Sequence, residues 1–181
     1  IGFAGSTGLV MGYSRFLKLE QESSRVMATA NWEHQLFLNF NPTGLATINI
    51  TKCEIGQHIG TALAQAVVEE LELDWNDVRI NYPESNKKWG MMITGGSWSV
   101  NRTFERNSQI GASARIALIE AGAKLMKVPI GECYAERSKV VHNDGNSIAY
   151  SEILNRTTID RVFSEEELKA IELKKFGEYK I

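Results

Sequence analysis

Two glycine-bearing loops carry the residues whose types and spacing could do chemistry: residues 54–57, Glu-Ile-Gly-Gln, and residues 94–99, Thr-Gly-Gly-Ser-Trp-Ser. Glycine leaves its backbone N–H group uncovered, and such groups bind a phosphate or another extended polar ligand well. Each loop leads into a predicted helix, whose first N–H groups and dipole favour an anion. Because two helix starts of this kind could converge on one elongated ligand, we predict part of a site for a bulky phosphate-bearing cofactor.

A purely structural turn is the alternative for either loop, because glycines are common before helices. Neither loop matches a nucleotide fingerprint: no G-x-G-x-x-G follows the first strand, and no Gly-Lys-Ser/Thr ends a phosphate loop. A nucleotide-binding protein is therefore disfavoured. The formal net charge of -2 gives no general attraction to nucleic acid, so we expect no nucleic-acid partner.

The cysteines and histidines offer little metal or redox chemistry. Cys53 and Cys133 are too few for a disulfide framework, and neither belongs to a C-x-x-C pair. We predict that each is a buried structural thiol, with a single bridge between them as the alternative. His34 and His142 lie far along the chain from other ligand-type residues, so we assign no metal ligand.

The first loop is positioned by a predicted strand–helix–strand unit. Alternating apolar residues over 36–40 and 45–51 predict two strands, and the Asn-Pro-Thr-Gly turn between them makes a hairpin. Apolar residues at helical spacing over 57–73 predict a helix. Residues 78–82 then predict another strand, which Pro83 ends.

The second loop precedes the longest predicted helix, residues 100–127. Its middle is crowded with glycine, alanine and serine, so we expect it to lie buried against a sheet or the loops. Residues 133–135 and 139–142 predict short strands, residues 150–155 a short helix, and residues 164–175 a solvated helix or tail. The predicted fold class is α/β (α+β), with a hairpin, a strand–helix–strand unit and a long buried helix.

The chain divides into three predicted parts. Its 43% hydrophobic and 23% charged residues are typical of an ordinary soluble domain. Residues 1–13 are apolar, glycine-rich and too short to span a bilayer, which favours the hydrophobic part of a twin-arginine export signal over a buried N-terminal segment. We interpret residues 1–33 as an export-signal remnant and linker, residues 34–156 as the cofactor-binding domain, and residues 157–181 as a linker toward a following domain.

Longer stretches around the loops resemble the large subunits of molybdenum hydroxylases, the xanthine dehydrogenase and aldehyde oxidase family. Residues 54–63, with Glu-Glu-Leu at 69–71 and Asp-Trp at 74–75, resemble its E-M-G-Q-G-x-x-T-A-L…A-E-E-L-x-x-D-W segment. Residues 93–100 are similar to its T-G-G-S-x-S-V loop, and later landmarks fit its V-P…E-C…L-S-Y-x-E-L pattern. The resemblance covers residues 32–154, and by pattern it is strong for isoquinoline 1-oxidoreductase beta subunits and periplasmic aldehyde dehydrogenases.

The resemblance implies a molybdopterin that holds molybdenum, in the form extended as molybdopterin cytosine dinucleotide. It implies hydroxylation of aldehydes or N-heterocycles with water as the oxygen source. It also implies three partners, namely the remainder of the large subunit, a 2Fe-2S small subunit and a cytochrome c electron acceptor, in the periplasm or alternatively the cytoplasm. The residues that it places on the cofactor are Gly56, Gln57, Gly95, Gly96, Ser97, Trp98 and Ser99.

The resemblance assigns no catalytic residue in this chain. The family's glutamate base belongs to a motif that has no counterpart here, and Glu54 matches the cofactor-loop motif instead. Because the family's subunits are several-fold longer, we predict that these 181 residues alone are inactive. His58 stands where the family has glycine, so the loop has either moved its glycine to Gly60 or turned His58 into the site. A non-catalytic binding or assembly module with an empty cofactor site is the alternative function.

Overall fold

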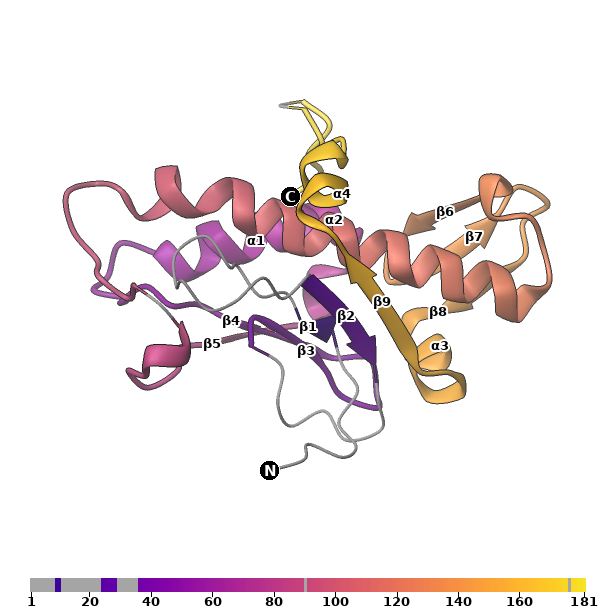
Figure 1. The fold of residues 1–181 in the computed structure, drawn as a ribbon, viewed down its shortest axis with the longest axis horizontal. Helices are drawn as coiled ribbons and strands as arrows, with labels where there is room; N and C mark the ends of the chain where they lie inside the picture. Colours follow the sequence, from indigo (N-terminus) through magenta and orange to yellow (C-terminus); the bar gives the residue numbers. More distant parts are fainter. Residues whose placement is uncertain (1–8, 11–23, 29–35, 90, 176) are drawn as a thin grey trace.

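One long helix, α2 (Ser99–Met126), runs along the longest axis of the molecule and packs against most other elements (Figure 1). The described part of the chain has no helix with the length and apolar character that a membrane span requires. Residues 1–8 and 11–13, on which the export-signal prediction depends, lie outside the described residues. The computed structural model describes residues 9–10, 24–28, 36–89, 91–175 and 177–181.

The predicted hairpin and strand–helix–strand unit are confirmed. β3 (Leu38–Phe40) and β4 (Ala46–Asn49) pair antiparallel. α1 (Ile59–Leu71) follows, and β5 (Val78–Asn81) then lies parallel to β4, which completes the sheet order β3-β4-β5. A parallel pair needs a crossover connection, and α1 provides it.

A second sheet lies at the far end of α2. β6 (Cys133–Glu136) and β7 (Lys139–His142) pair antiparallel as predicted, and β8 (Ser147–Ala149) adds a third strand that was not predicted. The helix α3 (Tyr150–Arg156) follows directly and confirms the short helix expected there. Figure 1 shows this sheet beside the C-terminal end of α2.

The third sheet joins segments that are far apart in the sequence. β1 (Leu9–Val10), β2 (Ser24–Ala28) and β9 (Ile159–Phe163) pair antiparallel in the order β1-β2-β9. Two of these strands occupy stretches that were predicted as linkers, so where the chain divides into domains stays a prediction. After β9 comes α4 (Glu165–Ala170), within the predicted solvated helix.

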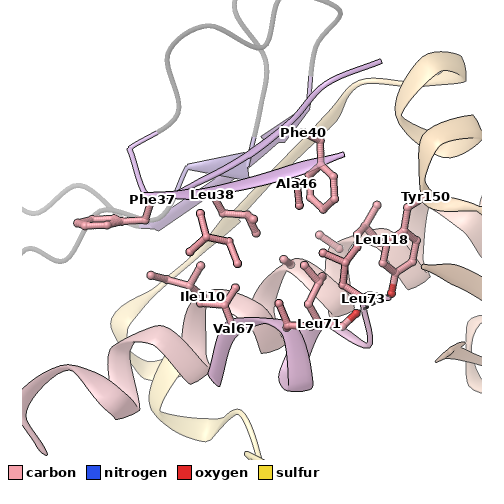
Figure 2. Packing of buried hydrophobic residues seen from close by; sticks show 14 of the residues in the cluster. Phe37, Leu38, Phe40, Ala46, Val67, Leu71, Leu73, Ile110, Leu118 and Tyr150 are labelled. Carbon is pink, nitrogen blue, oxygen red and sulfur yellow. Dashed lines mark hydrogen bonds between the residues drawn. The ribbon is translucent and has the colours of Figure 1, made fainter. Parts of the chain in front are cut away.

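The core lies between the β3–β4 hairpin and the two long helices (Figure 2). Val67 and Leu71 of α1, one turn apart, pack with Leu38 of β3 and with Ile110 of α2. All four side chains are at most 1% exposed. Tyr150 joins this cluster from α3, and its hydroxyl donates a hydrogen bond to the carbonyl oxygen of Leu71 at 2.8 Å. The hairpin and both helices therefore form one rigid support.

The two long helices approach each other most closely at Gly111. A Cβ there would lie 2.2 Å from the carbonyl oxygen of Val67 and 2.8 Å from the Cβ of Glu70. Only glycine allows this approach, which explains the small residues in the middle of α2 and confirms that this part of the helix is buried. Both helices begin at the same end of the molecule (Figure 1), so the contact helps to set the distance between their first turns.

Candidate functional site

The structure brings the two glycine-bearing loops together. Lys52, just before the first loop, donates from Nζ to the carbonyl oxygens of Met91 at 3.2 Å and Ile93 at 3.0 Å. The backbone N–H of Cys53 donates to the Oγ1 of Thr94 at 2.7 Å. These bonds join the chain entering the first loop to the chain entering the second. The two loops therefore lie side by side, and the convergence of their helix starts on one ligand stays a prediction.

Positive charge gathers where the loops meet. Lys52 is only 8% exposed, and burial lowers the pKa of its ammonium group. The charges of Arg106 and Arg102 on α2 lower that pKa further, which places all three cations near one another. A field of this sign suits a ligand that carries phosphate.

The carboxylate of Glu54 occupies N–H groups in the turn that leads into α1. Its Oε1 accepts from the backbone N–H groups of Gly56 at 2.7 Å and His58 at 3.0 Å. Its Oε2 accepts from the Tyr82 hydroxyl at 3.3 Å and lies 3.5 Å from the N–H of Gly60. Desolvation raises the pKa of Glu54, but these hydrogen bonds outweigh it and the net pKa is lowered. The anion position predicted at this helix start is thus filled by the protein's own carboxylate.

The side-chain amide of Gln57 closes the first loop on itself. Its Oε1 accepts from the N–H of Ile55 at 2.7 Å, and its Nε2 donates to the carbonyl oxygen of Cys53 at 3.0 Å. Both ends of the amide therefore hold the loop in shape. A contact from Gln57 or Gly56 to the cofactor stays a prediction. In this conformation such a contact would come from the outer side of the loop backbone, because the Gln57 amide is bonded within the loop.

The two departures around the first loop have different causes. His58 has φ 58°, in the left-handed region that glycine adopts most easily, so a glycine at this position would fit the same turn. Gly60 lies within α1, where a Cβ would stand 1.9 Å from the Tyr82 hydroxyl oxygen. The glycine of the turn has therefore not moved, and Gly60 instead makes room for Tyr82.

The second loop enters α2 through two consecutive left-handed residues, Gly96 with φ 60° and Ser97 with φ 57°. Trp98 follows at the helix N-cap position, and no side chain caps the helix there. The Arg102 guanidinium lies 3.5 Å from the centre of the Trp98 ring, one helical turn away. A Cβ on Gly95 would meet nothing within 4 Å, so open space lies in front of this loop.

Large apolar side chains are exposed on and around both loops. Ile55 is 75% exposed, Ile93 71%, Trp98 55% and Met91 52%. The ring of Trp98 is thus largely open to solvent, whereas Trp89 is buried at 7% exposed. A cavity of about 410 Å³ adjoins the second loop and is lined by Ser85, Asn86, Lys87, Met92 and Ile93. Exposed apolar groups gathered in one place indicate a surface that a ligand or another polypeptide covers.

The predictions for the cysteines and for His142 need correction. Cys53 is exposed and Cys133 partly exposed, and both are free thiols, so Cys53 is not a buried structural residue. The prediction that His142 lies far from other ligand-type residues is wrong. Its ring lies between two carboxylates, 2.8 Å from Asp144 and 2.9 Å from Glu132. Even so, no group of three or more acidic, cysteine or histidine residues in the described ranges is arranged to hold a metal ion. His34 lies outside those ranges.

Comparison with known proteins identifies the family. Residues 8–180 match the family model described as the molybdopterin cofactor-binding domain. The chain is 39% identical over 150 residues to the membrane-bound aldehyde dehydrogenase (pyrroloquinoline-quinone) of Gluconacetobacter polyoxogenes, covering 83% of this chain and 19% of that protein. It is 26% identical over 136 residues to the isoquinoline 1-oxidoreductase subunit beta of Brevundimonas diminuta, covering 71% and 17%. The chain thus spans less than a fifth of the length of these relatives.

Solved structures confirm the fold class. Quinoline 2-oxidoreductase from Pseudomonas putida 86 superposes with a TM-score of 0.51 at 16% identity, over 72% of this chain and 19% of that one. The Cu,Mo-CO dehydrogenase gives a TM-score of 0.53 at 16% identity, over 73% and 18%. At such identities the likeness shows the fold alone, and it agrees with the predicted mixture of helices and sheets in α/β (α+β) arrangement.

Proposed function

The chain belongs to the molybdopterin cofactor-binding domain family, and from that premise we propose that its two loops hold a molybdopterin within the large subunit of a molybdenum-dependent oxidoreductase. The observation that carries this proposal is the junction of the loops through Lys52 and Thr94. It brings the two glycine-bearing backbones together beside Lys52 and near exposed apolar side chains, which supports a ligand shared by both loops.

The residues around the two loops fit such a cofactor. Gly95 leaves open space for a flat ring system to approach, and Gly96 lies beside the Trp98 ring, 3.8 Å from where its Cβ would stand. The charges of Lys52 and Arg102 suit its phosphate, and the exposed Trp98 ring offers an apolar surface. The residues that we propose as cofactor contacts are Gly56, Gln57, Gly95, Gly96, Ser97, Trp98 and Ser99. When bound, the cofactor would supply the oxidation of a carbon centre with oxygen from water.

We propose aldehydes or N-heterocycles as substrates, because the two curated relatives are named for these two classes. The test is oxidation by the purified full-length protein of a short aldehyde and of an N-heterocycle, with an artificial electron acceptor and ¹⁸O-labelled water. Incorporation of the label into product supports the proposal, and oxygen derived from O₂ would contradict it. The 181 residues alone are expected to be inactive.

We propose that the remainder of the large subunit covers the exposed apolar side chains around the loops, because the match to this chain takes up less than a fifth of the relatives' length. A 2Fe-2S small subunit and a cytochrome c are the proposed electron carriers. A periplasmic location agrees with the membrane-bound relative. The proposed form of the cofactor is molybdopterin cytosine dinucleotide.

A matched pair of variants tests the assignment of the second loop. Gly96 and Gly145 both have left-handed backbones, with φ 60° and 94°, and Gly145 lies far from the loops in the turn between β7 and β8. Either Gly→Ala change introduces similar backbone strain, on the order of 1 kcal/mol. Only Gly96→Ala is expected to lower the molybdenum content of the full-length protein. Equal molybdenum in both variants would contradict the assignment.

A further inference from the structure

Glu54 ties separate parts of the first loop together. Its two carboxylate oxygens bond to the N–H groups of Gly56 and His58 and to the hydroxyl of Tyr82. Tyr82 comes directly after β5, so the loop is anchored to the sheet as well as to α1. Hydrogen bonds to a charged acceptor are about twice as strong as neutral ones, and a carboxylate at a helix start also gains from the helix dipole.

A carboxylate in this place excludes a phosphate from the start of α1. The N–H groups of Gly56 and His58 that would bind the phosphate already donate to Oε1, at 2.7 and 3.0 Å. A phosphate could reach them only by displacing Glu54 and leaving its negative charge close by, and like charges at such distances repel strongly. The first loop therefore meets a ligand with its outer edge, where Ile55 is 75% exposed.

Gly60 belongs to the same arrangement. The Tyr82 hydroxyl oxygen stands 1.9 Å from where a Cβ of residue 60 would lie, so any larger residue would push the hydroxyl away from Glu54. Tyr82 is 44% exposed and could otherwise turn toward solvent. The glycine and the tyrosine thus jointly place a donor beside the second carboxylate oxygen.

We propose that Glu54 is the positioning residue of the first loop: it substitutes for a ligand phosphate at the start of α1 and fixes the outer edge of the loop against the cofactor. This inference rests on the proposed function. The phosphate of the cofactor is then bound away from the start of α1. Glu54 itself touches neither the reacting atoms nor the metal, and it acts through Gly56 and His58.

The test compares cofactor retention in the full-length protein. Glu54→Ala removes the internal anion, Glu54→Gln removes its charge while keeping its shape, and Tyr82→Phe removes one donor. Glu105→Gln, on the exposed side of α2, is the control for the same loss of charge. Molybdenum and released pterin are measured per chain after dialysis, and thermal unfolding is measured on the cofactor-free forms so that ligand binding does not contribute.

Glu54→Ala is expected to retain at least tenfold less cofactor than Glu105→Gln, with Glu54→Gln and Tyr82→Phe in between. The cofactor-free forms of the two conservative variants, Glu54→Gln and Tyr82→Phe, should unfold within about 3 °C of wild type while they retain less cofactor, which a merely structural role would not give. Undiminished or increased retention in Glu54→Ala would overturn the inference, because it would mean that the phosphate competes with Glu54 for the start of α1. If Glu54→Ala does not fold, wild-type retention in both Glu54→Gln and Tyr82→Phe overturns it equally. A wild-type protein without molybdenum or pterin would instead refute the proposed function.

Discussion

Replacing Gly111 by alanine tests whether the contact between α1 and α2 supports the site. The added Cβ would stand 2.2 Å from the carbonyl oxygen of Val67, whereas Cβ contacts below 3.0 Å essentially do not occur. The helices must therefore separate by about 0.8 Å, since the obstructing atom belongs to the backbone. Overpacking of this kind costs about 1–3 kcal/mol, and the better helix propensity of alanine returns about 1 kcal/mol. Because the obstructing atom belongs to the backbone, we expect the upper end of the overpacking cost, about 3 kcal/mol, and a net loss of about 2 kcal/mol.

The free energy of unfolding is measured by urea denaturation, and molybdenum content is measured on the full-length protein. For a chain of this size a loss of 2 kcal/mol corresponds to a fall of about 4–8 °C in the unfolding temperature. The control is Gly131→Ala, because a Cβ at Gly131 would meet nothing within 4 Å. It should change stability by less than about 0.5 kcal/mol and leave the molybdenum content unchanged. A Gly111→Ala variant as stable as this control would refute the backbone contact and the rigid support inferred from it.

Three further predictions concern the loops and the second sheet. His58→Gly should stabilise the chain by about 0.5–1 kcal/mol in urea denaturation, because the left-handed backbone no longer strains a side chain, and a loss of stability would contradict the turn geometry. Lys52→Met should lower the free energy of unfolding by about 2 kcal/mol and speed proteolytic cleavage near residues 91–93, because the carbonyl oxygens of Met91 and Ile93 lose their donor. An unchanged cleavage rate would contradict the inference that Lys52 holds the two loops together. Hydrogen bonds from the His142 ring to the carboxylates of Asp144 and Glu132 raise the pKa of His142 above its ordinary 6.5. Its stabilising effect is therefore complete below about pH 6.5 and is lost as the pH rises through the raised value. The unfolding temperatures of wild type and His142→Gln should therefore differ at about pH 5.5 and converge at high pH, and a pH-independent difference would exclude the ion pairs.

Periodicity predicted the helices and strands that can be recognised from their own residue pattern. α1 and α2 repeat apolar or small residues at helical spacing, and the β3–β4 turn carries its own proline and glycine, so each could be found without knowing its neighbours. β9 could not be found in this way, because it becomes a strand by pairing with β2, which lies more than a hundred residues earlier in the chain. β8 is a three-residue strand that β7 alone holds in place, which is too short for an alternating pattern to stand out.

The candidate site shows the same limit at the level of side chains. Glycine spacing identified both loops, but it could not reveal that Glu54 folds back onto Gly56. The sequence does not show whether a backbone N–H group is free or already bonded to a side chain. Lys52 was missed since a lone lysine before a loop carries no pattern. Arg102 had only part of a signal: it lies in the predicted helix, four residues after Trp98, but Trp98 falls before the predicted start of that helix.

The central claim is that this domain holds a molybdopterin, and the most direct test is the cofactor content of the full-length protein from a host able to make the cofactor. Molybdenum is determined by mass spectrometry, and the cofactor is released, oxidised and identified. We expect one molybdenum and one pterin for each chain, with cytidine monophosphate released on hydrolysis. Absence of both molybdenum and pterin would contradict it and favour a binding or assembly module with an empty site, and pyrroloquinoline quinone in their place would identify a different cofactor.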